Sequence, residues 1–131
     1  MLARAVALAV VQRDETALAN IAVSEQEFRD HVWPSLPAAR PERNLPFSYV
    51  WKDLHQKSLQ GLQGILSEYA GQMLDVTEVS FEGVRDYGGY RVHGPTRFLI
   101  RTAGGADTIR LAGSFLEKNG RWKVFSYVVN D

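Results

Sequence analysis

The chain has 131 residues, and its 15 basic residues are matched by 15 acidic ones. A chain of this length fits a single domain, here residues 1–131, and the balanced charge leaves no basic stripe for a nucleic-acid partner. It contains no cysteine, which excludes disulfide scaffolds, thiolate nucleophiles and cysteine–zinc sites, and no segment reaches the ~18 consecutive apolar residues of a membrane span.

The N-terminal segment has a basic residue and then an apolar run, which is the order found in a signal peptide. The apolar run over residues 5–11 is short, however, and the polar residues after it offer no small-residue cleavage site. Leu2, Val6, Ala9 and Val10 instead have the spacing of an amphipathic helix. We therefore expect a soluble protein with a helix here. Its compartment stays open: the helix favours the cytoplasm, and a signal peptide removed beforehand would place the protein in the periplasm or outside the cell.

Capping residues predict two short helices next. Asp14 can cap a helical turn, and Ser24 with Glu27 has the spacing of a capping box. The second helix is expected to end at Trp33, because a residue that precedes proline disfavours helical backbone angles. Residues 34–46 contain four of the chain's five prolines and are predicted to form a surface loop.

A long helix is predicted from about Phe47 to Ala70, with Gly71 after its end, on the strength of a continuous apolar stripe. Two small residues, Ser58 and Gly61, interrupt this stripe. Glycine within a helix costs ~1 kcal/mol relative to alanine. We therefore expect another helix or a ligand to pack closely at Gly61.

The second half of the chain has the β-branched and aromatic residues typical of strands. Asn119-Gly120 favours a type I′ turn, which places Lys118 opposite Arg121 and sets the register of the last hairpin. The sequence predicts a meander of four antiparallel strands, over residues 74–84, 90–103, 108–118 and 121–130.

Two of these strands are expected to be irregular. The apolar alternation changes between Val76 and Val79, which indicates a bulge. Gly94-Pro95 interrupts the second strand, because proline cannot donate a hydrogen bond to a central ladder. Since the helices precede the strands rather than alternating with them, the predicted class is α+β, with N-terminal helices packed on a curved four-stranded meander.

The register of the last hairpin divides the predicted sheet into two faces. We expect one face to lie beneath the long helix, with Gly113 opposite Ser126. That face holds apolar and small residues from three strands: Phe98, Ile100, Ile109, Leu111, Gly113, Phe115, Trp122, Val124, Ser126 and Val128.

The opposite face is too aromatic for a sheet that faces solvent. It places Arg110 opposite Leu99, with Arg97 and Arg101 diagonal to it, so these like charges need acidic partners. A second subunit would supply such partners; the alternative is a solvated basic patch. We therefore predict a homodimer that forms through this face, at Leu99, Arg101, Arg110, Leu116, Phe125 and Tyr127.

The element order, together with the segments Gly113–Val129 and Asp14–Leu18, resembles the nuclear transport factor 2-like superfamily of cone-shaped, cystatin-like α+β folds. The resemblance implies a pocket between the long helix and the concave sheet face, and dimerisation through the other face. The resemblance is compatible with several functions, because the superfamily includes isomerases, dehydratases, cyclases and non-catalytic binding domains. The proline-rich residues 34–46 stand where members usually have a small hairpin, so the rim of the pocket is not predicted.

Small residues among aromatic ones indicate where such a pocket would lie. Ser58 and Gly61 on the helix would face Gly113 and Ser126 on the sheet and leave a cavity of ligand size. The alternative is that neighbouring aromatic side chains fill the space. The predicted ligand-binding residues are Trp51, Ser58, Gly61, Phe98, Gly113, Phe115, Trp122 and Ser126.

Candidate catalytic residues are few. His55 lies at the edge of the helical stripe and can act as an acid or base near neutral pH; the alternative is an ordinary surface histidine. Tyr90 is the most plausible inward hydroxyl, against the alternative of an ordinary strand-edge tyrosine. The three histidines are widely spaced, so we expect no metal site and no cofactor.

Three functions follow from these observations. The favoured one is non-catalytic binding of a small apolar or amphipathic ligand, because no acid–base set can be assigned. The second is a cofactor-independent isomerase, dehydratase or cyclase that uses His55 or Tyr90. The third is a protein-interaction module that uses the aromatic sheet face.

Overall fold

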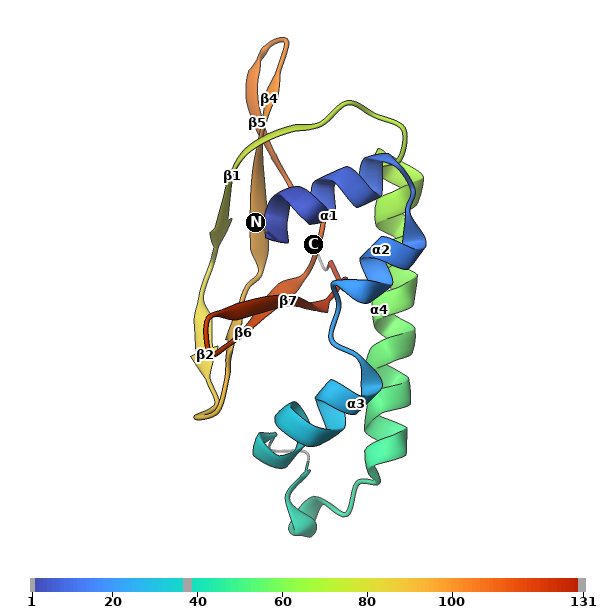
Figure 1. Ribbon diagram of the computed structural model, residues 1–131, viewed down its shortest axis with the longest axis vertical. Helices are drawn as coiled ribbons and strands as arrows, with labels where there is room; N and C mark the ends of the chain where they lie inside the picture. Colours follow the sequence, from blue (N-terminus) through green and yellow to red (C-terminus); the bar gives the residue numbers. More distant parts are fainter. Residues whose placement is uncertain (1, 37–38, 130–131) are drawn as a thin grey trace.

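The computed structural model describes residues 2–36 and 39–129, and it confirms the α+β class: helices fill the first half of the chain and strands the second (Figure 1). The long helix stands on one side of the molecule, and the strands lie on the other side (Figure 1). The shorter helices lie on the side of the long helix that faces the strands (Figure 1). The helices are α1 (Leu2–Val11), α2 (Glu15–Asn20), α3 (Glu25–Glu27) and α4 (Phe47–Tyr69).

Both predicted caps are present. The Asp14 carboxylate accepts a hydrogen bond from the Ala17 N–H at 3.1 Å and caps α2. Ser24 and Glu27 form a reciprocal capping box, with distances of 3.1 and 3.0 Å. The helix that they begin was predicted to end at Trp33, but the helical turns continue to Ser35. It continues as a π-helical turn, Phe28–Val32, and a 3₁₀ turn, Trp33–Ser35, because a proline in the first turn of a helix lacks only an N–H that needs no partner there.

Helix α4 follows a further 3₁₀ turn, Pro41–Arg43, and its predicted extent is confirmed to within one residue. Gly71 follows its end with a φ of +82°, a conformation that glycine adopts readily. The Gly71 N–H donates to the Val11 carbonyl at 2.9 Å, which joins the ends of α4 and α1. None of the described helices is long and apolar enough to cross a membrane.

The strands keep the predicted meander order but form two antiparallel sheets rather than one of four strands. One sheet has the order β1-β4-β5 and the other β2-β3-β6-β7. The breaks fall at Gly83, at Gly94-Pro95 and over residues 110–113, where glycine and proline weaken a ladder. The strands are β1 (Asp75–Phe81), β2 (Val84–Asp86), β3 (Arg91–His93), β4 (Thr96–Thr102), β5 (Gly105–Ile109), β6 (Ser114–Lys118) and β7 (Arg121–Ser126).

The last hairpin has the predicted turn and a bulge that was not predicted. Lys118 pairs with Arg121, and Asn119 and Gly120 both have positive φ, as a type I′ turn requires. Further along, Phe115 pairs with Val124 but Ser114 pairs with Ser126, so Phe125 is an extra residue in β7. One extra residue moves every later side chain to the other face of a sheet. The prediction that Ser126 lies opposite Gly113 is therefore wrong by one position. The bulge expected in the first strand is confirmed, between Val76 and Glu78.

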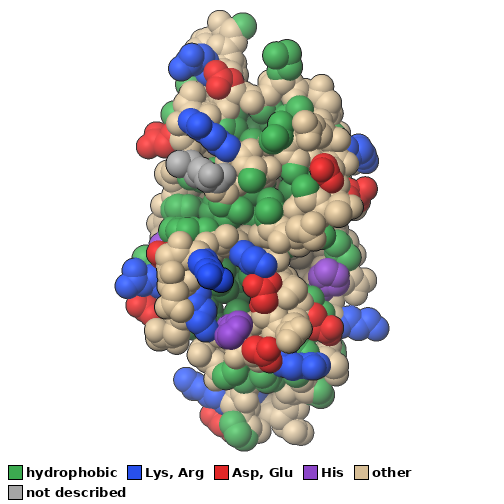
Figure 2. Space-filling view, in the orientation of Figure 1, with side chains coloured by type: hydrophobic (Ala, Val, Ile, Leu, Met, Phe, Trp, Pro, Cys, Tyr) green, Lys and Arg blue, Asp and Glu red, His purple; other side chains and the backbone are tan. Residues whose placement is uncertain are grey.

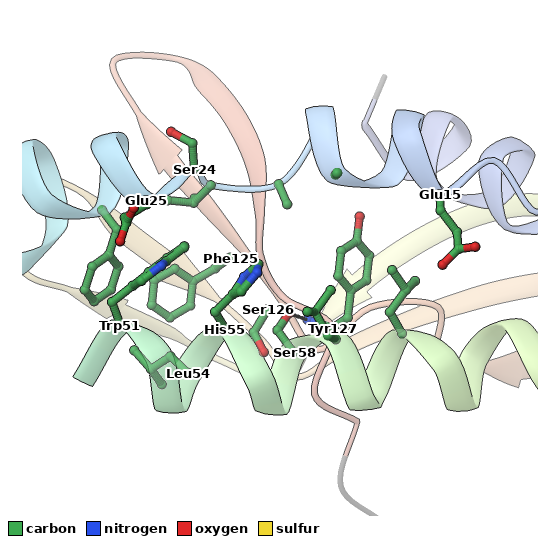
Figure 3. A pocket seen from close by; sticks show the side chains of 16 residues that line it. Glu15, Ser24, Glu25, Trp51, Leu54, His55, Ser58, Phe125, Ser126 and Tyr127 are labelled. Atoms are coloured by element: carbon green, nitrogen blue, oxygen red, sulfur yellow. Dashed lines mark hydrogen bonds between the residues drawn. The ribbon is translucent and has the colours of Figure 1, made fainter. Parts of the chain in front are cut away.

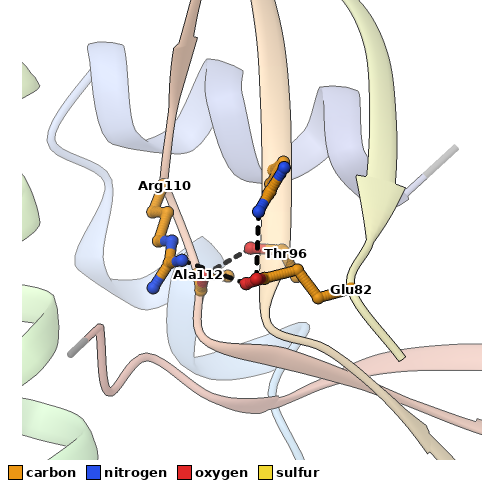
Figure 4. Close-up of polar contacts among 5 residues, drawn as sticks. Glu82, Thr96, Arg110 and Ala112 are labelled. Carbon is orange, nitrogen blue, oxygen red and sulfur yellow. Dashed lines mark hydrogen bonds and ion pairs between the residues drawn. The ribbon is translucent and has the colours of Figure 1, made fainter. Parts of the chain in front are cut away.

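The arginines of the predicted dimer face have acidic partners within the same chain. The Glu82 carboxylate accepts from Arg97 at 2.9 Å and from Arg110 at 3.0 Å (Figure 4), and Arg101 lies 3.8 Å from Asp75. The prediction that Arg110 faces Leu99 is wrong. Leu99 pairs with Thr108, because the turn between β4 and β5 comes one residue earlier than predicted.

Two hydrophobic clusters cover both faces of the second sheet. The first lies beneath α1, α2 and the C-terminal half of α4 and includes Leu18, Leu66, Phe98, Phe115 and Val124. The second lies beneath residues 28–36 and the start of α4: it contains Phe28, Val32, Tyr90 and Leu116, with Trp51 and Phe125 packed against it.

These clusters correct the prediction of an open aromatic face. Leu116 is buried in the second cluster, because residues 28–36 fold over it. Tyr127 is buried in the first cluster, because the bulge turns it inward. Trp122, which was predicted to face inward, is instead 38% exposed and stacks on Phe81 with ring centroids 6.0 Å apart.

Charged side chains of both signs are interspersed over the face seen in Figure 2, and hydrophobic side chains are exposed in a band across its middle. This face therefore carries no broad region of a single charge.

Candidate cleft between the long helix and the last strand

A cleft of about 410 Å³ lies between α4, the segment that joins α2 to α3, and the end of β7 (Figure 3). We call it the helix–strand cleft. It shares only Trp51, Ser58 and Ser126 with the predicted pocket, and most of its wall consists of other residues.

One helical stripe of α4 forms the first wall. Leu54 and Leu59 on this stripe are 38% and 47% exposed, although both side chains are large and apolar. Residues separated by three and four positions lie on one side of a helix. The six α4 residues that line the cleft have this spacing: Trp51, Leu54, His55, Ser58, Leu59 and Leu62.

The second wall is attached directly to β7. The Val23 N–H donates to the Val124 carbonyl at 2.9 Å, and the Val124 N–H donates to the Ile21 carbonyl at 2.8 Å. Residues 21–23 thus pair alongside β7 and hold the α2–α3 connection in place. Phe28, Phe125 and Tyr127 contribute aromatic surface to this side of the cleft.

Most polar groups of the cleft already have partners. Ser58 Oγ accepts from the Tyr127 N–H, and Ser126 Oγ accepts from the Val128 N–H, both at 3.0 Å. At one end of the cleft, Gln63 donates to the Glu15 carboxylate at 2.9 Å.

His55 and Glu25 differ from these groups. The His55 ring stacks on Trp51, with centroids 5.1 Å apart and planes at 16°. Within residues 2–36 and 39–129, neither His55 nor the Glu25 carboxylate has a hydrogen-bond or ion-pair partner, although both line the cleft.

The predicted group of small residues does come together, but it holds the chain's own C-terminal segment. A Cβ atom at Gly61 would clash with the Tyr127 carbonyl, and one at Gly113 would clash with the Val128 carbonyl. Ser58 and Ser126 bind the backbone of the same segment. Backbone therefore fills the space that was predicted to be a cavity, and the close partner expected at Gly61 is neither a helix nor a ligand.

The remaining predicted ligand-binding residues separate into groups. Trp51, Ser58 and Ser126 line the helix–strand cleft. Phe98 and Phe115 are buried in the first hydrophobic cluster, and Trp122 lies away from the cleft. Sequence reasoning missed the leucines of α4 and Phe125 as cleft residues. The stripe over residues 51–62 was the signal for the leucines, whereas the wall at Phe125 depends on the bulge.

The two catalytic candidates do not meet. His55 lines the cleft, but Tyr90 is buried in the second cluster, where its hydroxyl donates to the Val32 carbonyl at 3.3 Å. Burial, with a smaller contribution from Tyr87, raises the pKa of Tyr90 to about 12. Tyr90 is therefore a neutral structural phenol at physiological pH.

The described part of the chain contains no group of three or more His, Asp or Glu residues placed to hold a metal ion. No protein-family model, curated protein or solved structure shows a significant match to the chain. The case for a function therefore depends on the cleft itself.

Proposed function

We propose that the protein binds a small amphipathic molecule in the helix–strand cleft, without catalysis. The observation that carries this proposal is the α4 wall, where Leu54 and Leu59 are left partly open beside the stacked Trp51 and His55 rings. Full burial of a leucine side chain is worth ~1.5–3 kcal/mol. A ligand that covers this wall would gain part of that free energy, and the cleft volume lies within the range of small-molecule sites.

The proposal favours binding over catalysis because His55 has no hydrogen-bond partner among the described residues of the cleft. General acid–base chemistry needs a second group that binds or polarises the substrate within hydrogen-bond reach. The serines of the cleft are engaged with backbone, and Tyr90 lies elsewhere. The enzymatic alternative would have to use His55 with the Glu25 carboxylate or with a group that the ligand itself supplies.

Titration with a neutral fluorescent amphiphile, N-phenyl-1-naphthylamine, tests the site. Leu59→Glu places a charge on the apolar wall without removing a core side chain, so we expect it to weaken probe binding at least ~10-fold. Tyr49→Glu is the matched control on the same helix: Tyr49 is 64% exposed and does not line the cleft, and we expect no change. Equal affinity for the Leu59 variant and the unchanged protein would overturn the assignment of the cleft.

Incubation of the protein with a ligand that it binds separates binding from catalysis. Recovery of that ligand chemically unchanged supports the proposal. Conversion of the ligand that His55→Gln abolishes would instead support a cofactor-independent enzyme.

We also propose that the fold is a divided form of the nuclear transport factor 2-like cone. Its support is the element order, with short helices, then one long helix, then a meander of antiparallel strands. The homodimer stays a prediction: of its predicted residues Leu116 and Tyr127 are buried, Arg101 is exposed, and Leu99, Arg110 and Phe125 are partly exposed. Native mass spectrometry of freshly purified protein tests the homodimer and would reveal a co-purified small molecule.

A further inference from the structure

The charges along the helix–strand cleft are unbalanced. Among the described residues that line it are two carboxylates, Glu15 and Glu25, and one imidazole, His55, but no lysine or arginine. The two carboxylates lie toward opposite ends of the cleft, with the apolar wall between them (Figure 3). Its two carboxylates make a cleft of this composition negatively charged at neutral pH.

Glu25 is the carboxylate that is available to a ligand. Glu15 already accepts a hydrogen bond from Gln63. Glu27, two residues beyond Glu25, forms an ion pair with Lys123 at 2.7 Å. Burial opposes the charge on Glu27, but the hydrogen bonds from Lys123 and Ser24 hold its pKa below the usual value. Glu25 has no such cation among the described residues and is exposed, so its carboxylate is free to bind a ligand.

Aromatic surface lies at the same end of the cleft as this carboxylate. Glu25 and Trp51 lie at the same end of the cleft in Figure 3, and Phe28 packs on Trp51 with ring centroids 5.3 Å apart. An ammonium group is stabilised by the face of an aromatic ring and by a carboxylate. Among the described lining residues, only the imidazole of His55, which stacks on Trp51, can carry a positive charge.

From this arrangement we infer that the ligand is a cationic amphiphile: an apolar body that lies along Leu54 and Leu59, with a protonated amine at the Glu25 end. This inference rests on the proposed function and adds the charge of the ligand to it. An amphiphile with a carboxylate or sulfate head would meet two carboxylates and, among the described lining residues, no lysine or arginine, so the cleft selects against it.

Three probes of equal chain length test the inference: decylammonium, 1-decanol and decanoate, each used below its micelle concentration to displace N-phenyl-1-naphthylamine at pH 7.5. We expect decylammonium to displace the probe at a concentration at least ~10-fold lower than decanol, and decanoate to be the weakest. Glu25→Gln should remove the advantage of the amine and leave decanol unchanged. Glu78→Gln is the matched control, because Glu78 is exposed on β1, outside the cleft, and the substitution changes the net charge equally.

The outcomes separate this inference from the proposed function. Equal displacement by all three probes, or an amine advantage that survives Glu25→Gln, would overturn the cationic ligand and leave the cleft as a binding site. Failure of the neutral dye and of every probe to bind would overturn both. A loss of the amine advantage in Glu25→Gln alone, with unchanged thermal stability in both variants, is the result that supports the inference.

Discussion

Ser58 on α4 accepts a hydrogen bond from the backbone N–H of Tyr127 at 3.0 Å, and this bond ties the middle of the long helix to the segment that follows β7. One turn further along α4, Gly61 leaves room for the carbonyl of the same Tyr127. On one face of the helix, the Ser58 hydroxyl thus binds this peptide segment and the absence of a side chain at Gly61 makes room for it. This contact holds the cleft's α4 wall against its strand wall.

The close approach at Gly61 predicts opposite effects for two glycines of α4. Alanine favours a helix over glycine by ~1 kcal/mol, so Gly64→Ala, where the added methyl meets open space, should stabilise the protein. Gly61→Ala should instead destabilise it by about 2 kcal/mol or more, because the methyl collides with backbone that cannot rotate away. Urea unfolding of both variants measures the difference. A stabilising Gly61→Ala would contradict the packing described here.

Removal of the Tyr127 hydroxyl should cost stability. The hydroxyl donates to the Leu18 carbonyl at 2.6 Å, in a buried position that joins α2 to the end of β7. Tyr127→Phe leaves that carbonyl without this partner, so we expect a loss of about 1–3 kcal/mol in the free energy of unfolding. Tyr49→Phe, at an exposed position of α4, should stay within ~0.5 kcal/mol of the unchanged protein. Similar values for the two variants would argue against the bond.

Alkaline pH should destabilise the protein through its buried tyrosines. The folded state raises the pKa of Tyr90 to about 12, whereas an unfolded tyrosine titrates near ~10. Tyr90 therefore stabilises the folded state only while its phenol is neutral. This stabilisation is complete below pH ~10 and is lost as the pH rises toward ~12. The absorbance of tyrosinate at 295 nm should show late titration that Tyr90→Phe reduces. Titration of every tyrosine near pH 10 in folded protein would contradict the burial.

We expect Glu82 to contribute more to the free energy of unfolding than a carboxylate that forms one exposed ion pair. Its carboxylate bridges Arg97 on β4 and Arg110 beyond β5, beside the buried bond from the Thr96 hydroxyl to the Ala112 carbonyl (Figure 4). We expect Glu82→Gln to lower the free energy of unfolding by ~1 kcal/mol, and less in high salt. Asp75→Asn, which loses only the 3.8 Å pair with exposed Arg101, should have an effect near zero. Thermal unfolding at low and high salt checks both, and equal effects would count against the bridge.

Features that depend on near neighbours could be predicted from the sequence. The capping box at Ser24 and Glu27, the turn at Asn119-Gly120 and the extent of α4 each follow from residues a few positions apart. Their physical causes are local: a side-chain oxygen within reach of a free N–H, a backbone angle that asparagine and glycine tolerate, and an apolar stripe. The stripe predicted the helix, but sequence reasoning assigned only Trp51, Ser58 and Gly61 of α4 to a pocket and missed the leucines of the cleft wall.

Only the tertiary structure decided which segments distant in the sequence contact one another. The small residues Ser58 and Gly61 indicated a close partner, but that partner could be identified as the segment after β7 only once distant parts of the chain were placed together. The single extra residue at Phe125 turned Tyr127 from the predicted outer face into the core. A one-residue shift changes local strand propensity little, yet it moves every later side chain to the other face of the sheet. For that reason the sequence by itself determined the helices and strands, whereas tertiary packing determined the cleft.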